Sequence, residues 1–207
     1  MFHTLVQGGV MMIPIGLCSL VGLTIVVERF IALRRGLVFD ERVLRLTEGF
    51  SEKTSPDAAL AVCRQAHGAF ARLIEECLRV KHLEHDQIIE TMHASGRTQI
   101  AGLERGLNIL EIVAGVSPLL GLLGTVLGMI RVFNAITAKG IGNPQVLSSG
   151  IAEALITTVA GLCVAIPAVA CHSWLAHKVD DYATEMQERA TAFVVRLLAS
   201  QKRRGSE

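Results

Sequence analysis

Three long apolar stretches divide the chain, and each is long enough to cross a membrane as one helix. The first, Thr4 to Val27, contains no Lys, Arg, Asp or Glu, and the second, Ile112 to Ile130, contains none either. The third runs from Gly150 to Ala176 and carries a single carboxylate, Glu153. At 1.5 Å per residue, 19 residues cover about 28 Å of a hydrocarbon core about 30 Å thick. The pattern predicts membrane-spanning helices at about residues 8–30, 111–132 and 150–176.

The segments between and after these runs are polar but keep helical spacing. Residues 34–105 form the longest polar segment, in which Ser55 followed by Pro56 is a helix-start signal. An apolar stripe then continues as one run to about Lys81, and a further helix start lies near Glu84. We expect Ile88 to Asn108 to continue straight into the second span. The tail, residues 178–207, has helical spacing and could extend the third span.

The distribution of basic residues predicts the orientation in the membrane. No Lys or Arg precedes Glu28, whereas twelve lie between Arg29 and Arg105, and the tail after Lys178 is also basic. Because basic residues stay on the cytoplasmic side, the N-terminus is expected outside and the C-terminus inside. The prediction is an all-α membrane protein of one domain, residues 1–207, with three transmembrane helices and long cytoplasmic helical extensions.

Composition narrows the possible functions. The chain has 207 residues, of which 51% are hydrophobic and 19% charged, with a formal net charge of +1. A near-neutral charge gives no reason to expect a nucleic-acid partner. The five cysteines form no CxxC pair, and His82 and His85 lie beside acidic residues in a solvated helix start. We expect neither a metal nor a cofactor.

The third span carries the candidate chemistry. A charge at bilayer depth costs about 3 kcal/mol, so Glu153 is expected to face a bundle interior or a water-filled path. Glu153, Thr157, Gly161 and Ala165 fall on one ridge of this helix, while Thr158 lies about 140° round it from Glu153. The alternative interpretation is a structural carboxylate that caps a neighbouring helix.

The second span supplies a further hydroxyl, Thr125, at a depth similar to that of Thr157 and Thr158. Two polar spans cannot enclose a pore, and a homo-oligomer solves that problem. Glycines permit close helix contact in lipid, and proline is tolerated there. The predicted packing residues are Pro118, Gly121, Gly124 and Gly128 in the second span and Gly161 and Pro167 in the third.

Two segments make a family resemblance specific. SPLLGLLGTVLGMIRVF (Ser117–Phe133) and GIAEALITTVAGLCVAIPAV (Gly150–Val169) resemble the signature segments of the MotA/TolQ/ExbB proton-channel family, and most closely those of ExbB and TolQ. The resemblance implies a homopentamer in the bacterial inner membrane around the single-span helices of an ExbD/TolR-type partner. It places the family's functional positions on Thr125, Glu153 and Thr158. Thr157 stands where alanine is common, so either threonine could face the lumen.

What this resemblance implies about function is energy transduction. The chain is expected to be a proton-channel or stator subunit that uses the proton gradient to power outer-membrane transport with ExbD and TonB, or envelope maintenance with TolR and TolA. One alternative is a non-conducting scaffold for a single-span partner; another is a stator for another motility or secretion system. An intramembrane protease is disfavoured, because Ser117, Ser148 and Ser149 have no His or Lys nearby in the predicted topology.

Overall fold

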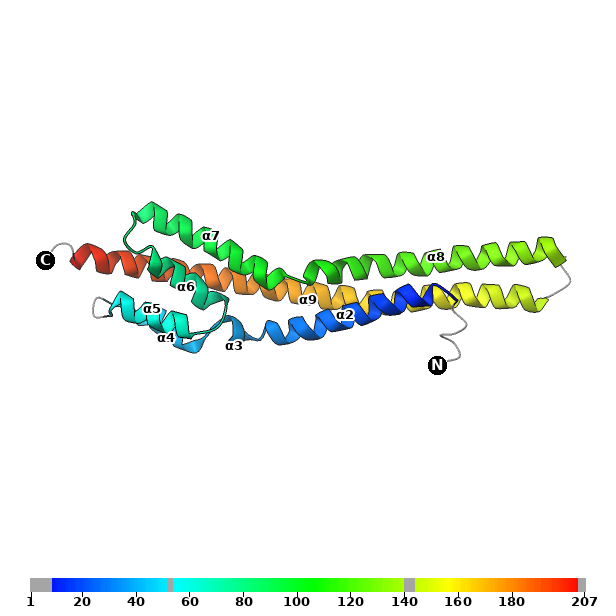
Figure 1. Ribbon diagram of the computed structural model, residues 1–207, viewed down its shortest axis with the longest axis horizontal. Helices are drawn as coiled ribbons and strands as arrows, with labels where there is room; N and C mark the ends of the chain where they lie inside the picture. Colours follow the sequence, from blue (N-terminus) through cyan, green and yellow to red (C-terminus); the bar gives the residue numbers. More distant parts are fainter. Residues whose placement is uncertain (1–8, 52–53, 140–143, 205–207) are drawn as a thin grey trace. The chain divides into compact units, whose positions relative to one another are not determined.

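The computed structural model describes residues 9–51, 54–139 and 144–204, and all regular structure within them is helical, which confirms the all-α prediction. Figure 1 shows the helices along the chain. Their bounds are α2 Met12–Ala32, α3 Arg35–Val38, α4 Glu41–Glu48, α5 Pro56–Gln65, α6 Ala69–Arg79, α7 His85–Glu104, α8 Leu107–Lys139 and α9 Pro144–Arg204.

Two compact units share these helices. The first, here called the membrane unit, comprises Met1–Glu28 and Gly106–Trp174; the second, here called the polar unit, comprises Arg29–Arg105 and Leu175–Glu207. The N-terminus that is expected outside, residues 1–7, and the connection between α8 and α9, residues 140–143, lie outside the described residues.

Three helices are long and apolar enough to cross a membrane, as the hydrophobic pattern predicts. The candidate spans are Met12–Ala32, Leu107–Thr137 and part of Ser148–Ser200. Helix α9 is continuous through Pro167, so the predicted extension of the third span into the tail is confirmed as far as Arg204. The orientation of these spans and their assembly into an oligomer stay predictions.

Within the membrane unit, α8 and the first part of α9 lie side by side, packed through small residues (Figure 1). A Cβ added at Gly121 would lie 3.0 Å from the Thr157 carbonyl oxygen, and one added at Gly128 would lie 3.0 Å from the Ala154 Cβ. Glycines lower helix propensity in water, but in lipid they let two backbones approach closely. The α8–α9 interface is therefore built on backbone proximity rather than on large side chains.

The polar unit has a core centred on α6, where Phe70, Leu73, Ile74, Cys77 and Leu78 are all buried. Aromatic contacts join this core to α9: the Phe39 ring lies 5.5 Å from that of Phe70 and 5.6 Å from that of Tyr182. The Tyr182 hydroxyl donates to the Leu33 carbonyl oxygen at 3.1 Å. Within the polar unit, Leu33 and Phe39 thus pack against the second half of α9.

Two arginines of α9 bind the end of α4 in the polar unit. Arg196 donates to the carbonyl oxygens of Thr47 and Glu48 at 2.6 and 3.0 Å, which satisfies the free carbonyls at the end of α4. Arg189 pairs with Glu48 at 2.8 Å and with Glu185 at 2.9 Å. These two partners raise the pKa of Arg189 above its ordinary value, the Glu48 hydrogen bond most strongly.

Two predicted continuities were wrong, and a glycine explains each. The run predicted from Ser55 to about Lys81 is two helices, α5 and α6, separated at Gly68, whose φ is +117°. A Cβ there would lie 2.6 Å from the Leu37 carbonyl oxygen, so only glycine fits. Likewise α7 does not continue into α8, because the helix ends before Arg105 and Gly106 has a φ of +88°. The predicted helix starts at Pro56 and near Glu84 are confirmed.

Candidate functional site

The predicted carboxylate, Glu153, lies in an ion pair near the end of the membrane unit where α8 finishes and α9 begins. Arg131 Nη1 of α8 donates to Glu153 Oε1. The Glu153 side chain is 21% exposed and that of Arg131 is 51% exposed. A paired carboxylate avoids part of the cost of about 3 kcal/mol that an isolated charge meets at bilayer depth. Glu153 therefore has a compensating charge within its own chain.

Sequence reasoning missed Arg131 as a site residue and treated it only as the end of the second span. A usable signal was present. Arg131 lies six residues before Thr137 and Glu153 five residues after Ser148, the two ends of the candidate spans. At 1.5 Å per residue both lie about 8 Å inside their spans, so opposite charges at equal depth could have been matched.

The first helix also reaches this end of the site. The backbone of Gly9, three residues before α2 begins, lies directly against the Glu153 carboxylate, and a Cβ built on Gly9 would overlap that group. Gly9 has φ +65°, a conformation that favours glycine. The segment just before α2 thus joins α8 and α9 in forming the surroundings of Glu153.

Thr157 lies in the seam between α8 and α9. Its side chain is buried, and its Oγ1 donates to the Ala154 carbonyl oxygen at 2.8 Å. A Cβ added at Gly124 of α8 would lie 2.6 Å from the Thr157 Cβ. The ridge of Glu153, Thr157, Gly161 and Ala165 therefore packs toward α8 from Thr157 onward, and Gly161 lies against the backbone of Ser117.

Thr158 and Thr125 occupy less buried positions on the same helix pair. Thr158 Oγ1 donates across the interface to the Gly121 carbonyl oxygen at 3.3 Å. Thr125 Oγ1 donates to the Leu122 carbonyl oxygen of its own helix at 2.7 Å. Because the neighbouring Gly124 contacts Thr157, Thr125 is at the level of the two threonines of α9. Each hydroxyl donates to a backbone carbonyl, and its oxygen lone pairs remain acceptors for water or a proton carrier.

The two prolines lie within the helices rather than at their ends. Pro118 is half-buried in α8 and Pro167 is exposed in α9. Neither has an N–H group, so the carbonyls four residues earlier lose their usual helical partner. Beside Pro118, the buried Ser117 donates its hydroxyl hydrogen to the Val113 carbonyl oxygen at 2.6 Å, so in the described part of the chain this hydroxyl is directed at the backbone and not at a base.

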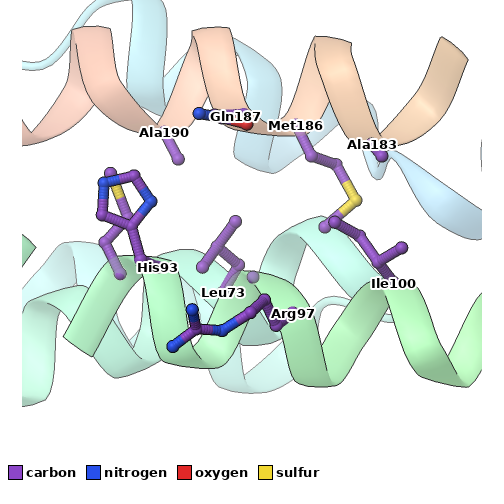
Figure 2. Close-up of a pocket in the computed structure, with 10 residues that line it drawn as sticks. Leu73, His93, Arg97, Ile100, Ala183, Met186, Gln187 and Ala190 are labelled. Carbon is purple, nitrogen blue, oxygen red and sulfur yellow. The ribbon is translucent and has the colours of Figure 1, made fainter. Parts of the chain in front are cut away.

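The polar unit contains a separate small groove of about 80 Å³ between α7 and α9. Figure 2 shows Ile100 of α7 and Met186 of α9 reaching toward each other, with His93 at the opposite end. No carboxylate or cysteine lines it. Its full lining is Leu73, Met92, His93, Gly96, Arg97, Ile100, Ala183, Met186, Gln187 and Ala190. Across residues 9–51, 54–139 and 144–204, moreover, no three His, Cys, Asp or Glu side chains gather as a metal site.

Comparison with known proteins identifies relatives of this chain. The model of the MotA/TolQ/ExbB proton channel family matches residues 64–188, more than half of the chain. An ExbB-like biopolymer transport protein of Synechocystis is 36% identical over 77% of this chain and 64% of that protein. Biopolymer transport protein exbB1 of Vibrio cholerae is 32% identical over 79% of this chain and 74% of that protein.

A TolQ-type relative matches a shorter region of the chain. The Tol-Pal system protein TolQ of Haemophilus influenzae is 37% identical over 50% of this chain and 47% of that protein. The chain spans 64% and 62% of the lengths of the Synechocystis relative and of an ExbB homologue from Methanothermobacter thermautotrophicus.

Proposed function

Because this chain belongs to the MotA/TolQ/ExbB proton channel family, an inner-membrane family, we propose that it is a proton-channel subunit of an energy-transducing motor. The proton-motive force would supply the energy, with no cofactor. The observation that carries the proposal is that the family match, residues 64–188, includes all four polar positions, Thr125, Glu153, Thr157 and Thr158. These positions lie on two adjacent helices, α8 and α9, whose backbones are in close contact.

The chemistry fits proton movement rather than bond formation. A proton in a water-poor path needs charged or hydroxyl groups at which water can be ordered. Glu153, Thr125 and Thr158 provide such groups at two levels of the α8–α9 pair. The Synechocystis and Vibrio cholerae relatives are named as biopolymer transport proteins, which supports a non-enzymatic role.

We favour an ExbB-type assignment over a TolQ-type one. Two ExbB-type relatives match 77% and 79% of this chain, whereas the TolQ relative matches 50% and three further ExbB relatives match 38–55%. The expected partners are then an ExbD-like single-span protein and a TonB-like protein, and the work is transport across the outer membrane. TolR-like and TolA-like partners, with a role in envelope maintenance, are the alternative.

The proposal includes a homopentamer. Large apolar side chains remain exposed along both α8 and α9, among them Leu119, Leu122, Leu155, Val159 and Ile166, which are 58–66% exposed. Lipid or neighbouring copies must cover these side chains. Native mass spectrometry of the detergent-solubilised protein should show a pentamer, and a purely monomeric spectrum would contradict this part of the proposal.

Replacing Glu153 tests the function itself. Glu153→Gln keeps the size of the side chain and its hydrogen bonding but removes the charge, so gradient-driven uptake across the outer membrane should be lost while the oligomer still assembles. Glu153→Ala serves as the comparison, because it also removes packing. If Glu153 were only a structural cap, Gln would work normally and only Ala would fail.

Membrane depolarisation separates a motor from a scaffold. A protonophore should abolish the activity of a motor, whereas a non-conducting scaffold would keep anchoring its partner. Uptake of a large substrate across the outer membrane measures ExbB-type function, and sensitivity of the envelope to detergent measures TolQ-type function. The two assays therefore also show which of the two systems the chain serves. A deletion strain with neither defect would overturn the assignment to either system.

A further inference from the structure

The ion pair between Arg131 and Glu153 joins two charges that stand apart from other charges within the apolar parts of α8 and α9. Arg131 is the sole Lys or Arg between positions 107 and 137, and Glu153 is the sole Asp, Glu, Lys or Arg between positions 144 and 174. Arg131 Nη1 donates to Glu153 Oε1. Each charge thus finds its partner on the neighbouring helix of the same chain.

Close backbone packing fixes the register that brings the two side chains together. A Cβ at Gly128, three residues before Arg131, would lie 3.0 Å from the Cβ of Ala154, the residue after Glu153. On a helix, residues three apart lie on one face. Sliding α9 along α8 would therefore break the Gly128–Ala154 contact and the ion pair together.

We propose that Arg131 is a positioning residue that keeps Glu153 a charged carboxylate in one orientation. Glu153 then acts as a fixed charge beside the proton path, and other groups carry the proton. The Arg131 guanidinium is always charged, and its N–H group donates directly to a Glu153 carboxylate oxygen, so the contact has the geometry of an ion pair. The fixed-charge role rests on the proposed channel function; the ionised state of Glu153 does not.

The surroundings of the pair fit this role. The carboxylate is mostly enclosed, at 21% exposure, whereas the guanidinium is half open, at 51%. The Gly9 backbone covers the carboxylate from the start of the first span and brings no charge. Among the described residues, the groups that other elements place against this carboxylate are therefore the Arg131 guanidinium and the Gly9 backbone.

Infrared spectroscopy of the full chain in lipid bilayers tests the charge state without requiring transport. A protonated carboxyl group has a C=O stretch that a carboxylate lacks. At neutral pH, the spectra of wild type and Glu153→Gln should show no difference in this band. Arg131→Gln should gain the band, and Arg131→Gln/Glu153→Gln should lose it again. Arg131→Lys keeps the charge and should resemble wild type.

Each alternative result is decisive. A protonated band in wild type that Glu153→Gln removes would overturn the proposal, as would the absence of the band in Arg131→Gln. Size-exclusion chromatography confirms that each variant assembles, and Arg131→Lys is the folded comparison if Arg131→Gln does not. In transport assays, Arg131→Lys should stay within about threefold of wild type, whereas Arg131→Gln should fall at least about tenfold, since an ammonium preserves charge but not guanidinium geometry.

Normal transport in every variant, together with the expected infrared pattern, would count against the channel function alone. The infrared pattern reports only the protonation of Glu153. The two proposals therefore fail separately.

Discussion

Gly161 of α9 lies against the backbone of α8, and replacing it with alanine would test how closely the two helices pack. A Cβ at this position would lie 2.5 Å from the Ser117 carbonyl oxygen and 3.2 Å from the Gly121 Cα. Ordinary van der Waals contact begins at 3.4 Å. Because both obstructing groups are backbone atoms, no side chain can rotate away, and the helices must separate.

The expected cost follows from two opposing effects. Overpacking a close interface costs about 1–3 kcal/mol, while alanine improves helix propensity over glycine by about 1 kcal/mol. Gly161→Ala should therefore destabilise the membrane unit by up to about 2 kcal/mol. Gly115→Ala in α8 is the matched control, since nothing lies within 4 Å of its added Cβ and only the propensity gain remains.

Unfolding of the purified protein in detergent micelles provides the measurement. The chain has a single tryptophan, Trp174, at the last position of the membrane unit, so its fluorescence reports on this unit. Gly161→Ala should unfold at lower denaturant than wild type and Gly115→Ala at equal or higher denaturant. Equal stability of the two variants would refute the close approach of α8 and α9.

Three further predictions concern the threonines, the orientation and a buried thiol. Thr158→Ala should impair gradient-driven transport with little loss of stability. Thr157→Ala should have a milder effect on transport but should lower the free energy of unfolding by about 1 kcal/mol, because Thr157 fills the interface beside α8. The reverse pattern would make Thr157 the hydroxyl that transport requires. In a variant without native cysteines, Glu41→Cys should resist an impermeant thiol reagent added from the periplasm and Thr137→Cys should react, and labelling of both would contradict the predicted topology. Burial raises the pKa of Cys77 to about 12, so its reactive thiolate is scarce at pH 8; mass spectrometry should find Cys77 alkylated only after denaturation, and rapid native labelling would show that α6 opens.

The sequence determined the elements and the location of the polar residues. An uncharged stretch of 19 residues cannot be stable in water as a surface helix, so length and polarity alone predicted three spans. Glu153 and the threonines stood out because polar groups are rare at bilayer depth. The apolar stripe through Phe70 and Leu73 likewise marked the core of α6 before any tertiary contact was known.

The tertiary structure decided which groups meet and where helices end. The helix boundaries at Gly68 and Gly106 depend on backbone conformations that glycine permits but does not require. The apolar periodicity of the sequence continues across both glycines, so it predicted continuous helices there. The partner of Glu153 depended on the register of α9 against α8, which is set by contacts such as Gly128 with Ala154. Helix periodicity places a residue on a face, and matching depths could suggest Arg131 as a partner of Glu153. Only the packing between the helices shows that the two side chains lie opposite each other.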